Sequence, residues 1–515
     1  MTTTDHAFRV YNTLTRKLED FTPLQPGHIG LYVCGMTVYD HAHVGHARAM
    51  VVFDALVRYL GAHGWEVNFV RNFTDVDDKI IRRAAELGEE PMALAERYIA
   101  SFREDTQALG LASPTHEPRV STSIGSIIDM IAHLVDNGHA YVNEGTVWFA
   151  VDTFAEYGKL SGQKVDELKS ADEVPGKRSG ADFALWKAAK PGEPEWESPW
   201  GPGRPGWHIE CSAMSREHLG AHFDIHGGGL DLVFPHHENE IAQSECGNKD
   251  HFANVWMHNG LLVVDDGAKM KGGVAADADD GPVKMGKSLG NVFNIRDALA
   301  AFPAEALRFY YLQAHYRSPL PWNGESSLPN ALAQLMRLYE ARERAEQMGG
   351  EGSADLIARE MGEAAQAVLE QGRGFVERYD AALAQDFNTP KALSYLFELA
   401  RAINRFADAK KALKRGGPVV APALAAFDHV RATLNLAAMD TRSFHEEVKH
   451  KRLAAMGLSV EAIDALMAER DTCRQERRWA DADRVRDDLA ERQILVMDTP
   501  EGSTWRLQLR GALPE

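Results

Sequence analysis

Four residues of the chain carry side chains that commonly bind transition metals, although they lie far apart in the sequence. They are two cysteines, a histidine and a glutamate, namely Cys34, Cys211, His236 and Glu240. Two thiolates, an imidazole and a carboxylate form a ligand set that suits Zn²⁺. On a helix that begins at Pro235, His236 and Glu240 would lie one turn apart on the same face. Because the four residues are spread over 206 positions and buried cysteines are often inert, spacing alone leaves a purely structural role open.

The pair His237-Glu238 would suit a zinc protease, but the rest of that motif is missing. The motif H-E-x-x-H requires a second histidine at position 241, which is Ile241. The other two cysteines, Cys246 and Cys473, lie outside these motifs, and none of the four cysteines forms a C-x-x-C pair. These features argue against a disulfide framework and for a reducing compartment.

A second group of candidate residues, His43, Gly45 and His46, follows a short apolar run that ends at Cys34 and Gly35. The run is typical of a buried parallel strand. Apolar residues then recur at helical spacing, which predicts a long helix that begins near His46. Strand, turn and helix in this order form the first half of a nucleotide-binding βαβ unit, in which phosphate binds at the helix N-terminus. Two imidazoles there could donate to phosphate oxygens, although histidines also occur at helix starts without such a role.

The second predicted strand, EVNFVRNF, ends in Thr74 and Asp75. In open α/β sheets, ligands bind beyond the carboxyl ends of the strands, so both side chains are placed to hydrogen-bond a small polar substrate. The same Asp-rich loop could instead cap the helix that follows, KIIRRAAELG.

The composition is that of an ordinary globular protein with several domains. The chain has 515 residues, of which 44% are hydrophobic and 25% charged, so about two to four domains are expected. Its net charge of −19 argues against a protein that coats nucleic acid without sequence preference. The charge is uneven, since residues 441–515 hold 13 Lys/Arg against 15 Asp/Glu, a net of −2. Because no apolar run reaches signal-peptide or membrane-spanning length, we expect a cytoplasmic protein without membrane association.

The pattern of elements predicts an α/β fold: a Rossmann-type nucleotide-binding domain with an insertion, then a helical bundle and a small mixed α/β C-terminal domain. A helix, strand-and-turn sequence and a Pro/Gly-rich return loop without regular structure make up the insertion. The bundle includes a helix that starts at Thr389-Pro390, and the last segment contains a strand pair near ILVMDTPEGSTWRLQL. We expect the first half of the nucleotide-binding domain at residues 1–113, the insertion at 114–204 and the second half with the ligand set at 205–265. A lysine-containing loop region at 266–325, the bundle at 326–440 and the C-terminal domain at 441–515 would follow.

The segment CGMTVYDHAHVGHAR resembles the first signature of the class I aminoacyl-tRNA synthetases, and its opening residues resemble the cysteinyl-tRNA synthetases in particular. NFTDVDDKI is also similar to that family. Val44 replaces the usual isoleucine and Met36 the usual proline, and both exchanges leave the polar groups in place. The resemblance implies that one Zn²⁺ per chain, which would take the substrate thiol as a further ligand, is held by Cys34, Cys211, His236 and Glu240.

Two further segments extend this resemblance. HGGGLD is similar to the adenosine-binding loop of class I synthetases, in which glycines let the backbone lie against the base; alone, such a run is also an ordinary turn. The segment Lys284-Met285-Gly286-Lys287-Ser288 is similar to the second class I signature, with Gly286 in place of the first serine. Its ammonium groups would meet the negative charge that accumulates on the leaving pyrophosphate.

The resemblance assigns roles to individual residues. The implied catalytic residues are His43, His46, Lys284 and Lys287. The implied ATP-binding residues are His43, His46, Gly227, Gly228, Gly229, Asp231 and Lys287. The implied substrate-binding residues are Gly35, Thr37, Thr74, Asp75 and Trp207.

The activity implied is ATP-dependent activation of L-cysteine, with Mg²⁺, followed by transfer to tRNA(Cys). Residues 114–204 would form the connective domain and residues 441–515 would bind the anticodon, and we expect a monomer. Two alternatives remain, a related ligase that joins activated cysteine to an amino sugar and a non-catalytic tRNA-binding relative. The helical and C-terminal domains argue against the first, and the intact histidines, lysines and ligand set argue against the second.

Overall fold

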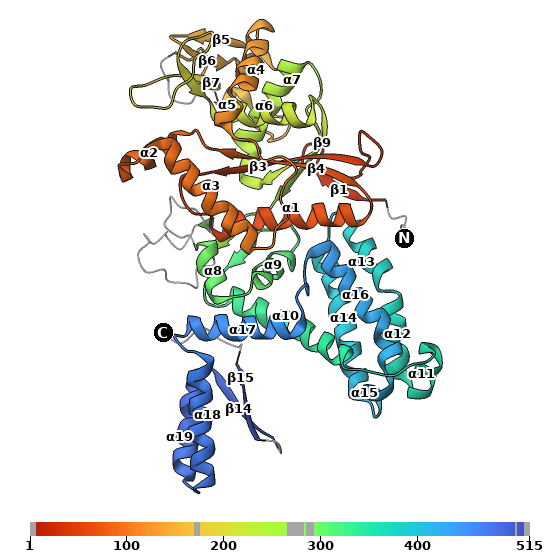
Figure 1. Ribbon diagram of the computed structural model, residues 1–515. Coiled ribbons are helices and arrows are strands. Elements are labelled where there is room, and N and C mark those ends of the chain that lie inside the picture. Colours follow the sequence, from red (N-terminus) through yellow and green to blue (C-terminus); the bar gives the residue numbers. More distant parts are fainter. Residues whose placement is uncertain (1–6, 169–175, 265–282, 285–292, 500–501, 509–515) are drawn as a thin grey trace. The chain divides into compact units, whose positions relative to one another are not determined.

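The computed structural model describes residues 7–168, 176–264, 283–284, 293–499 and 502–508 (Figure 1). The chain forms two compact units, each built from several stretches. Unit 1 comprises Met1–Leu261, Tyr316–Pro319 and Leu383–Asn388. Unit 2 comprises Leu262–His315, Leu320–Ala382 and Thr389–Glu515, so the chain passes between the units several times.

Unit 1 is organised around a four-stranded parallel sheet. The order β10-β9-β3-β4 is formed by β3 (His28–Thr37), β4 (Glu66–Thr74), β9 (Phe223–Gly229) and β10 (Ala253–Asn259). Buried apolar residues such as Leu31, Val70 and Ile225 fill these strands, as expected for a sheet covered on both faces. The apolar run before Cys34 and the segment EVNFVRNF are therefore strands, as predicted. The order of the strands reverses between β3 and β9, which makes this the switch point of the sheet.

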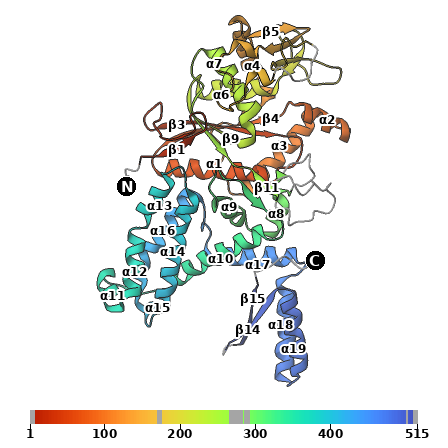
Figure 2. The ribbon, with the colours of Figure 1, turned by 180° about the vertical axis from the view of Figure 1, so that it is seen from behind.

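Helices cover both faces of this sheet (Figures 1 and 2). The helices α1 (Val44–Ala62) and α3 (Pro91–Ala108) lie on one face, and α4 (Ile124–Asp136), α6 (Trp207–Leu219) and α7 (Glu238–Asn248) lie toward the other. The helix α2 (Asp78–Leu87) follows β4, and its cap is Asp77, whose carboxylate accepts from Lys79 N–H at 2.8 Å. The helices predicted near His46, after the Asp-rich loop and in the insertion are confirmed.

The insertion contains a small antiparallel sheet of β5 (Ala140–Asn143), β6 (Thr146–Phe149), β7 (Phe183–Ala188) and β8 (Gly203–Pro205). The prediction of a return loop without regular structure is wrong at β8, which pairs with β7. Gly203 permits this pairing, because a Cβ there would lie 2.3 Å from Trp186 Nε1. The remaining elements of unit 1 include the hairpin of β1 (Arg9–Asn12) and β2 (Lys17–Asp20) and the helix α5 (Val165–Leu168).

Unit 1 is completed by two short segments from later in the chain. Arg48 lies on α1 and is fully buried. Its guanidinium donates to the carbonyl oxygens of Leu261 at 2.8 Å and Tyr316 at 3.4 Å, and to that of Ser318. Asp386 accepts from the Tyr316 hydroxyl at 2.8 Å. Residues 316–318 and 386 are therefore bonded to each other and to the helix that carries His46.

Unit 2 begins with a small sheet and continues mainly as helices. The strand β11 (Leu262–Val264) pairs antiparallel with β12 (Val283–Lys284) and parallel with β13 (Leu320–Trp322). The helices are α8 (Ile295–Ala301), α9 (Ala304–Leu312), α10 (Ser327–Glu346), α11 (Ala354–Met361), α12 (Glu363–Arg373), α13 (Phe375–Leu383), α14 (Thr389–Ala407), α15 (Ala412–Arg415) and α16 (Gly417–Leu434). The helical character predicted after Ser326 and the helix start at Thr389 are confirmed.

The C-terminal part of unit 2 has its own small core. It consists of α17 (Thr441–Ala455), α18 (Val460–Gln475), α19 (Trp479–Glu491) and an antiparallel hairpin of β14 (Ile494–Thr499) and β15 (Gly502–Leu507). Ile463, Leu489 and Ile494 are fully buried in this core. The predicted strand pair is confirmed. Among the residues that the structure describes, no helix has the length and apolarity needed to cross a membrane.

Candidate functional site

The predicted ligand set comes together at the carboxyl ends of β3 and β9. One donor atom from each of Cys34, Cys211, His236 and Glu240 lies within 4.8 Å of the others. Cys34 Sγ is 3.6 Å from Cys211 Sγ and 3.4 Å from Glu240 Oε1. His236 Nε2 is 2.9 Å from the same carboxylate oxygen. Donor atoms of a tetrahedral zinc site lie about 3.3–3.8 Å apart, so these residues can close on one ion with small shifts.

A wide turn, Val233–His237, carries the histidine ligand candidate to this point. The helix predicted to begin at Pro235 begins instead at Glu238. Phe234 is extended, with φ −136° and ψ 135°, which is the conformation favoured before a proline. The expected proximity of His236 and Glu240 nevertheless holds, because the turn leads directly into α7.

The electrostatics of the group favour an ionised Glu240 and Cys211, whereas burial and the neighbouring Cys211 hold the pKa of the Cys34 thiol well above its usual range. Burial raises the pKa of Glu240, but His226 and His236 outweigh this effect and hold that pKa well below its usual range. Burial lowers the pKa of His236, but Glu240 and Cys211 raise it to about 10. Burial raises the pKa of Cys211, but a hydrogen bond from Cys34 and the charge of His236 lower it to about 6. The group therefore already holds the carboxylate that metal binding needs, and a bound cation would replace the proton of the imidazole.

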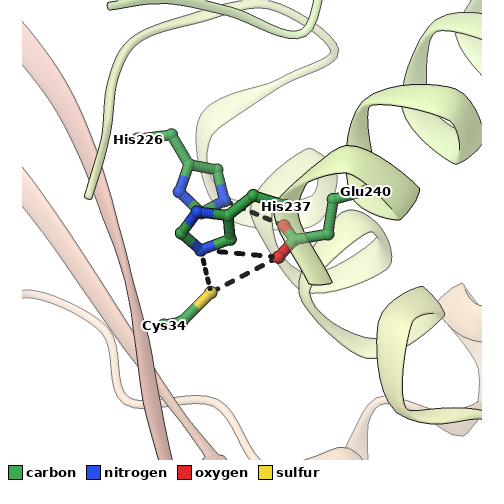
Figure 3. A group of neighbouring side chains, drawn as sticks. All are labelled: Cys34, His226, His237 and Glu240. Carbon is green, nitrogen blue, oxygen red and sulfur yellow. Dashed lines mark hydrogen bonds and ion pairs between the residues drawn. The ribbon is translucent and has the colours of Figure 1, made fainter. Parts of the chain in front are cut away.

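A second group of possible ligands shares Cys34 and Glu240 with the first and adds His226 of β9 and His237 (Figure 3). His237 Nε2 lies 3.3 Å from Cys34 Sγ. His226 Nε2 lies 2.8 Å from Glu240 Oε2. Neither histidine is among the site residues predicted from the sequence. The sequence features that could have pointed to them are the second histidine of PHHENE, which is His237, and the histidine of HGGGLD, which is His226.

His43 and His46 cap the start of α1. His43 Nδ1 accepts from the backbone N–H groups of Gly45 at 3.1 Å and His46 at 3.4 Å. His46 Nδ1 accepts from His43 N–H at 3.3 Å, and the two rings stack with their centroids 3.7 Å apart. Their placement at the helix N-terminus is confirmed, whereas phosphate binding stays a prediction.

Several predicted glycines are required by packing within unit 1. A Cβ on Gly35 would lie 1.6 Å from a backbone carbonyl oxygen of β4. A Cβ on Gly227 would lie 2.4 Å from the ring of Phe53, and one on Gly228 would lie 2.8 Å from His237 Cε1. No side chain fits at these positions whether or not a ligand is bound, so their contacts with cysteine or ATP stay predictions.

Thr74 and Asp75 are buried at the end of β4 and have partners within the protein. The Thr74 hydroxyl donates to Glu210 Oε2 at 2.9 Å. The Asp75 carboxylate accepts from the backbone N–H of Ser121 at 3.0 Å and from its hydroxyl. Burial raises the pKa of Asp75. The Asp-rich loop caps the next helix, as the alternative predicts, but it does so through Asp77. Contact of Thr74 and Asp75 with a substrate stays a prediction.

Three further predicted residues occupy different positions around the site. Trp207 begins α6 and stacks on His236, with ring centroids 4.3 Å apart. Thr37, which is half-buried, ends β3 opposite the last residue of β4. Asp231 is exposed in a single turn of helix, Leu230–Leu232, directly after β9.

The lysine-containing loop is described only in part. The backbone of Lys284 lies on β12, which pairs with β11. Gly286 and Lys287 lie outside the described residues. The roles predicted for both lysines stay predictions.

Comparison with known proteins gives matches along the chain. Residues 20–332 match the family model "tRNA synthetases class I (C) catalytic domain", residues 378–426 the DALR domain and residues 457–506 the "Cysteinyl-tRNA ligase anticodon binding domain". The cysteine–tRNA ligase of Thioalkalivibrio sulfidiphilus is 46% identical over 502 residues, which cover 97% of this chain and 99% of that protein. That of Alkalilimnicola ehrlichii is 49% identical over 504 residues, covering 96% and 99%. The chain belongs to the cysteine–tRNA ligase family.

Membership of this family makes the chain a class I aminoacyl-tRNA ligase, as its sequence signatures predict. Solved structures support the fold. Mycobacterium tuberculosis methionyl-tRNA synthetase in complex with methionyl-adenylate is 13% identical, with a TM-score of 0.58 and coverage of 85% of this chain and 96% of that chain. The Agrobacterium radiobacter K84 agnB2 LeuRS in complex with tRNA and LeuAMS is 12% identical, with a TM-score of 0.56 and coverage of 83% and 86%. The predicted Rossmann-type fold followed by helical domains is confirmed.

Proposed function

We propose that this chain is a cysteine–tRNA ligase, which activates L-cysteine with ATP and then transfers it to tRNA(Cys). The observation that carries the proposal is the meeting of Cys34, Cys211, His236 and Glu240 at the carboxyl ends of β3 and β9. Open parallel sheets bind their ligands at the switch point between such strands. The capped start of α1, where we expect phosphate, follows β3 directly.

The proposal includes one Zn²⁺ per chain on these four residues, which fit the ion by donor chemistry. All four donor atoms lie within 4.8 Å of one another, and every residue but Cys34 is buried. When bound, zinc would act as a Lewis acid that accepts the cysteine thiol as a ligand, since a thiol ionises at the metal and a serine hydroxyl is a much poorer ligand. Trp207, which stacks on His236, would hold that imidazole in its ligating orientation and close one side of the site.

His43 and His46 would bind the phosphates of ATP. Because both rings accept backbone N–H groups at Nδ1, their protons lie on Nε2, from which they can be donated to phosphate oxygens. Lys284 and Lys287 would stabilise the charge on the departing pyrophosphate, and Mg²⁺ would accompany ATP. In this step a carboxylate oxygen of cysteine bonds to the α-phosphorus while the bond from that phosphorus to pyrophosphate breaks.

The remaining predicted contacts surround the same strand ends. Thr74 and Asp75 would receive the amino group of cysteine, and the bonds from Ser121 hold the Asp75 carboxylate in one orientation. Gly35 and Thr37 would line the same position on β3. The adenosine would lie against the backbone of β9 and the turn after it, at Gly227, Gly228, Gly229 and Asp231.

The tRNA would be bound by the later parts of the chain. Residues 457–506 match an anticodon-binding domain. Residues 441–515 carry only −2 of the net charge of −19, so they repel a polyanion less than the rest of the chain does. We further propose that the enzyme acts as a monomer in the cytoplasm, where aminoacylated tRNA is used.

ATP–pyrophosphate exchange with L-cysteine, followed by charging of total tRNA, tests this proposal. Exchange should require cysteine, and cysteinyl-tRNA should accumulate. Cys211→Ser should lower exchange strongly, whereas Cys246→Ser, at a buried cysteine outside the ligand set, should not. Exchange without tRNA charging but with ligation to an amino sugar would favour the related ligase, and tRNA binding without exchange would indicate a non-catalytic relative.

A further inference from the structure

We propose that Cys34, His226, His237 and Glu240 form a second metal position, which overlaps the first and holds one divalent cation of the zinc type in its place. This inference deepens the metal-binding part of the proposed function and rests on it. Because both positions use Cys34 and Glu240, only one of them can be filled at a time. Figure 3 shows the four side chains converging from β3, β9, the turn before α7 and α7 itself.

The donor atoms of this second group already lie close to the spacing of a tetrahedral site. Cys34 Sγ is 3.3 Å from His237 Nε2 and 3.4 Å from Glu240 Oε1. His237 Nε2 is 4.0 Å from the same carboxylate oxygen. These distances bracket the range of about 3.3–3.8 Å expected around zinc. His226 Nε2 is 2.8 Å from Glu240 Oε2, a hydrogen bond that a shared cation would replace.

The surroundings of His237 hold its ring with Nε2 toward the thiol. Its Nδ1 lies 2.8 Å from His258 Nε2, and His258 Nδ1 lies 2.8 Å from Thr13 Oγ1. Metal-binding histidines usually engage their second nitrogen in such a bond, which fixes the ring and its tautomer. Gly228 adds to this restraint, because a Cβ there would lie 2.8 Å from His237 Cε1. The imidazole is therefore pre-oriented for a ligand at Nε2.

The ring of His226 is also held in one orientation, and one of its nitrogen atoms has no hydrogen-bond partner among the described residues. Its ring stacks on Trp256, with centroids 4.4 Å apart and an interplanar angle of 14°. Both residues are buried, and His226 Nδ1 has no hydrogen-bond partner among the residues that the structure describes. An imidazole buried in this way is costly unless its other nitrogen has a strong partner. Glu240 is that partner here, and a cation on the carboxylate would be a stronger one.

The two positions differ in their donors, and this difference can be measured. The first offers two thiolates and one imidazole, and the second offers one thiolate and two imidazoles, each with the carboxylate. An ion that moves between them keeps Cys34 and Glu240 and exchanges two ligands, so it need not leave the protein. Cobalt(II) reports the number of bound thiolates through its sulfur-to-metal charge-transfer absorption.

Cobalt titration of the full-length, metal-free protein tests the inference. Wild type should bind one Co²⁺ with the absorption of two thiolates. Cys211→Ser should still bind one Co²⁺, with about half that absorption, since it retains one of the two thiolates. Adding His237→Ala to Cys211→Ser should weaken Co²⁺ binding by at least about 100-fold, as expected for loss of a ligand. The control Cys246→Ser, outside both groups, should match wild type.

A Cys211→Ser protein that binds no Co²⁺, or whose affinity is unchanged by His237→Ala, would overturn the inference. If Cys211→Ser does not fold, His236→Gln provides an independent test by zinc X-ray absorption. Its metal should have two imidazole ligands if the second position exists and none if it does not. Failure of wild type to bind Co²⁺ or Zn²⁺ would overturn the metal part of the proposed function as well, whereas the other outcomes bear on this inference alone.

Discussion

Two buried carboxyl groups, Glu240 in unit 1 and Glu305 in unit 2, respond in opposite ways to the loss of water. Glu240 is 0% exposed and Glu305 is 7% exposed. Burial raises the pKa of Glu305 to about 7, although the Tyr339 hydroxyl and a backbone N–H donate to it. Burial acts on Glu240 too, yet His226 and His236 hold the pKa of that carboxyl well below its usual range.

The difference shows what it takes to keep a buried carboxylate charged. Burial alone favours the neutral acid, and two neutral donors do not reverse this at Glu305. At Glu240 the charge persists because the cationic His236 lies 2.9 Å from one carboxylate oxygen and His226 lies 2.8 Å from the other. Both carboxyl groups are perturbed, but only Glu240 lies among possible metal ligands in the part of the chain that the structure describes. Glu305 is therefore a matched control for Glu240.

The largest expected effect tests whether the metal-binding group around Glu240 distinguishes cysteine from serine. Wild type should prefer cysteine over serine by at least about 10⁴-fold in kcat/KM for pyrophosphate exchange, because the wrong substrate would leave a metal coordination position poorly filled. Glu305→Gln should show the same ratio. A preference below about 100-fold, or hydrolysis of mischarged seryl-tRNA, would mean that the metal has only a structural role, since shape alone gives a ratio of that order.

The next effect concerns the ion pairs of Glu240. Glu240→Gln should lose bound zinc and lower the free energy of unfolding by about 3–5 kcal/mol, because the buried, cationic His236 loses its counter-charge and the buried His226 loses a hydrogen-bond partner. Elemental analysis and denaturant unfolding measure the two quantities. Glu305→Gln should retain zinc. Equal metal content in the two variants would remove the contrast between the two carboxyl groups.

A smaller effect is the pH dependence due to Glu305. Its pKa is about 7 in the folded protein against an ordinary value of 4.5, so the folded state binds this proton more tightly than the unfolded state does. Its contribution is fully present below pH 4.5 and is lost as the pH rises through 7. The difference in unfolding free energy between wild type and Glu305→Gln should therefore change by about 3 kcal/mol between these limits. Urea unfolding of both proteins at several pH values measures it, and a difference independent of pH would contradict the assignment.

The smallest effect is expected at a carboxylate on the surface. Hydrogen bonds from Arg470 and Arg474 lower the pKa of Asp498 on the C-terminal hairpin, but its side chain is 48% exposed. Asp498→Asn should therefore change the free energy of unfolding by less than about 1 kcal/mol, and less still in high salt. The contribution is present at neutral pH and disappears as the pH falls, because the folded-state pKa is depressed. Thermal unfolding at low and high salt tests this, and a large loss that resists salt would place Asp498 with the buried groups.

Sequence patterns were sufficient for most elements around the site. Buried apolar runs predicted β3 and β4, and helical spacing predicted α1, because these signals depend on neighbours along the chain. The contact between Cys34 and Cys211 could not be predicted from local patterns. Residue types permitted it and the family resemblance implied it, but spacing along the chain did not require it.

His226 and His237 could not have been found in the same way. Adjacent residues of a regular helix point about 100° apart, so His236 and His237 would not be expected at one ion. The wide turn before α7 brings both close to Glu240. The hydrogen-bond partners of Thr74 and Asp75 could not be predicted from the sequence either. Glu210 and Ser121 are far from them along the chain and come close only in the folded structure.

The discontinuity of unit 1 has a consequence for how the protein is made. Its first 261 residues are synthesised well before Tyr316–Pro319 and Leu383–Asn388, which belong to the same unit. At about 5–20 residues per second, the wait is roughly 3–11 s for residues 316–319 and roughly 6–25 s for residues 383–388. The first of these intervals is the one that concerns Arg48. During this time Arg48 lacks two of its carbonyl acceptors, and a buried charge without its partners is strongly unfavourable. We therefore expect the Arg48 side chain to stay hydrated until residues 316–318 have been synthesised and can close over it.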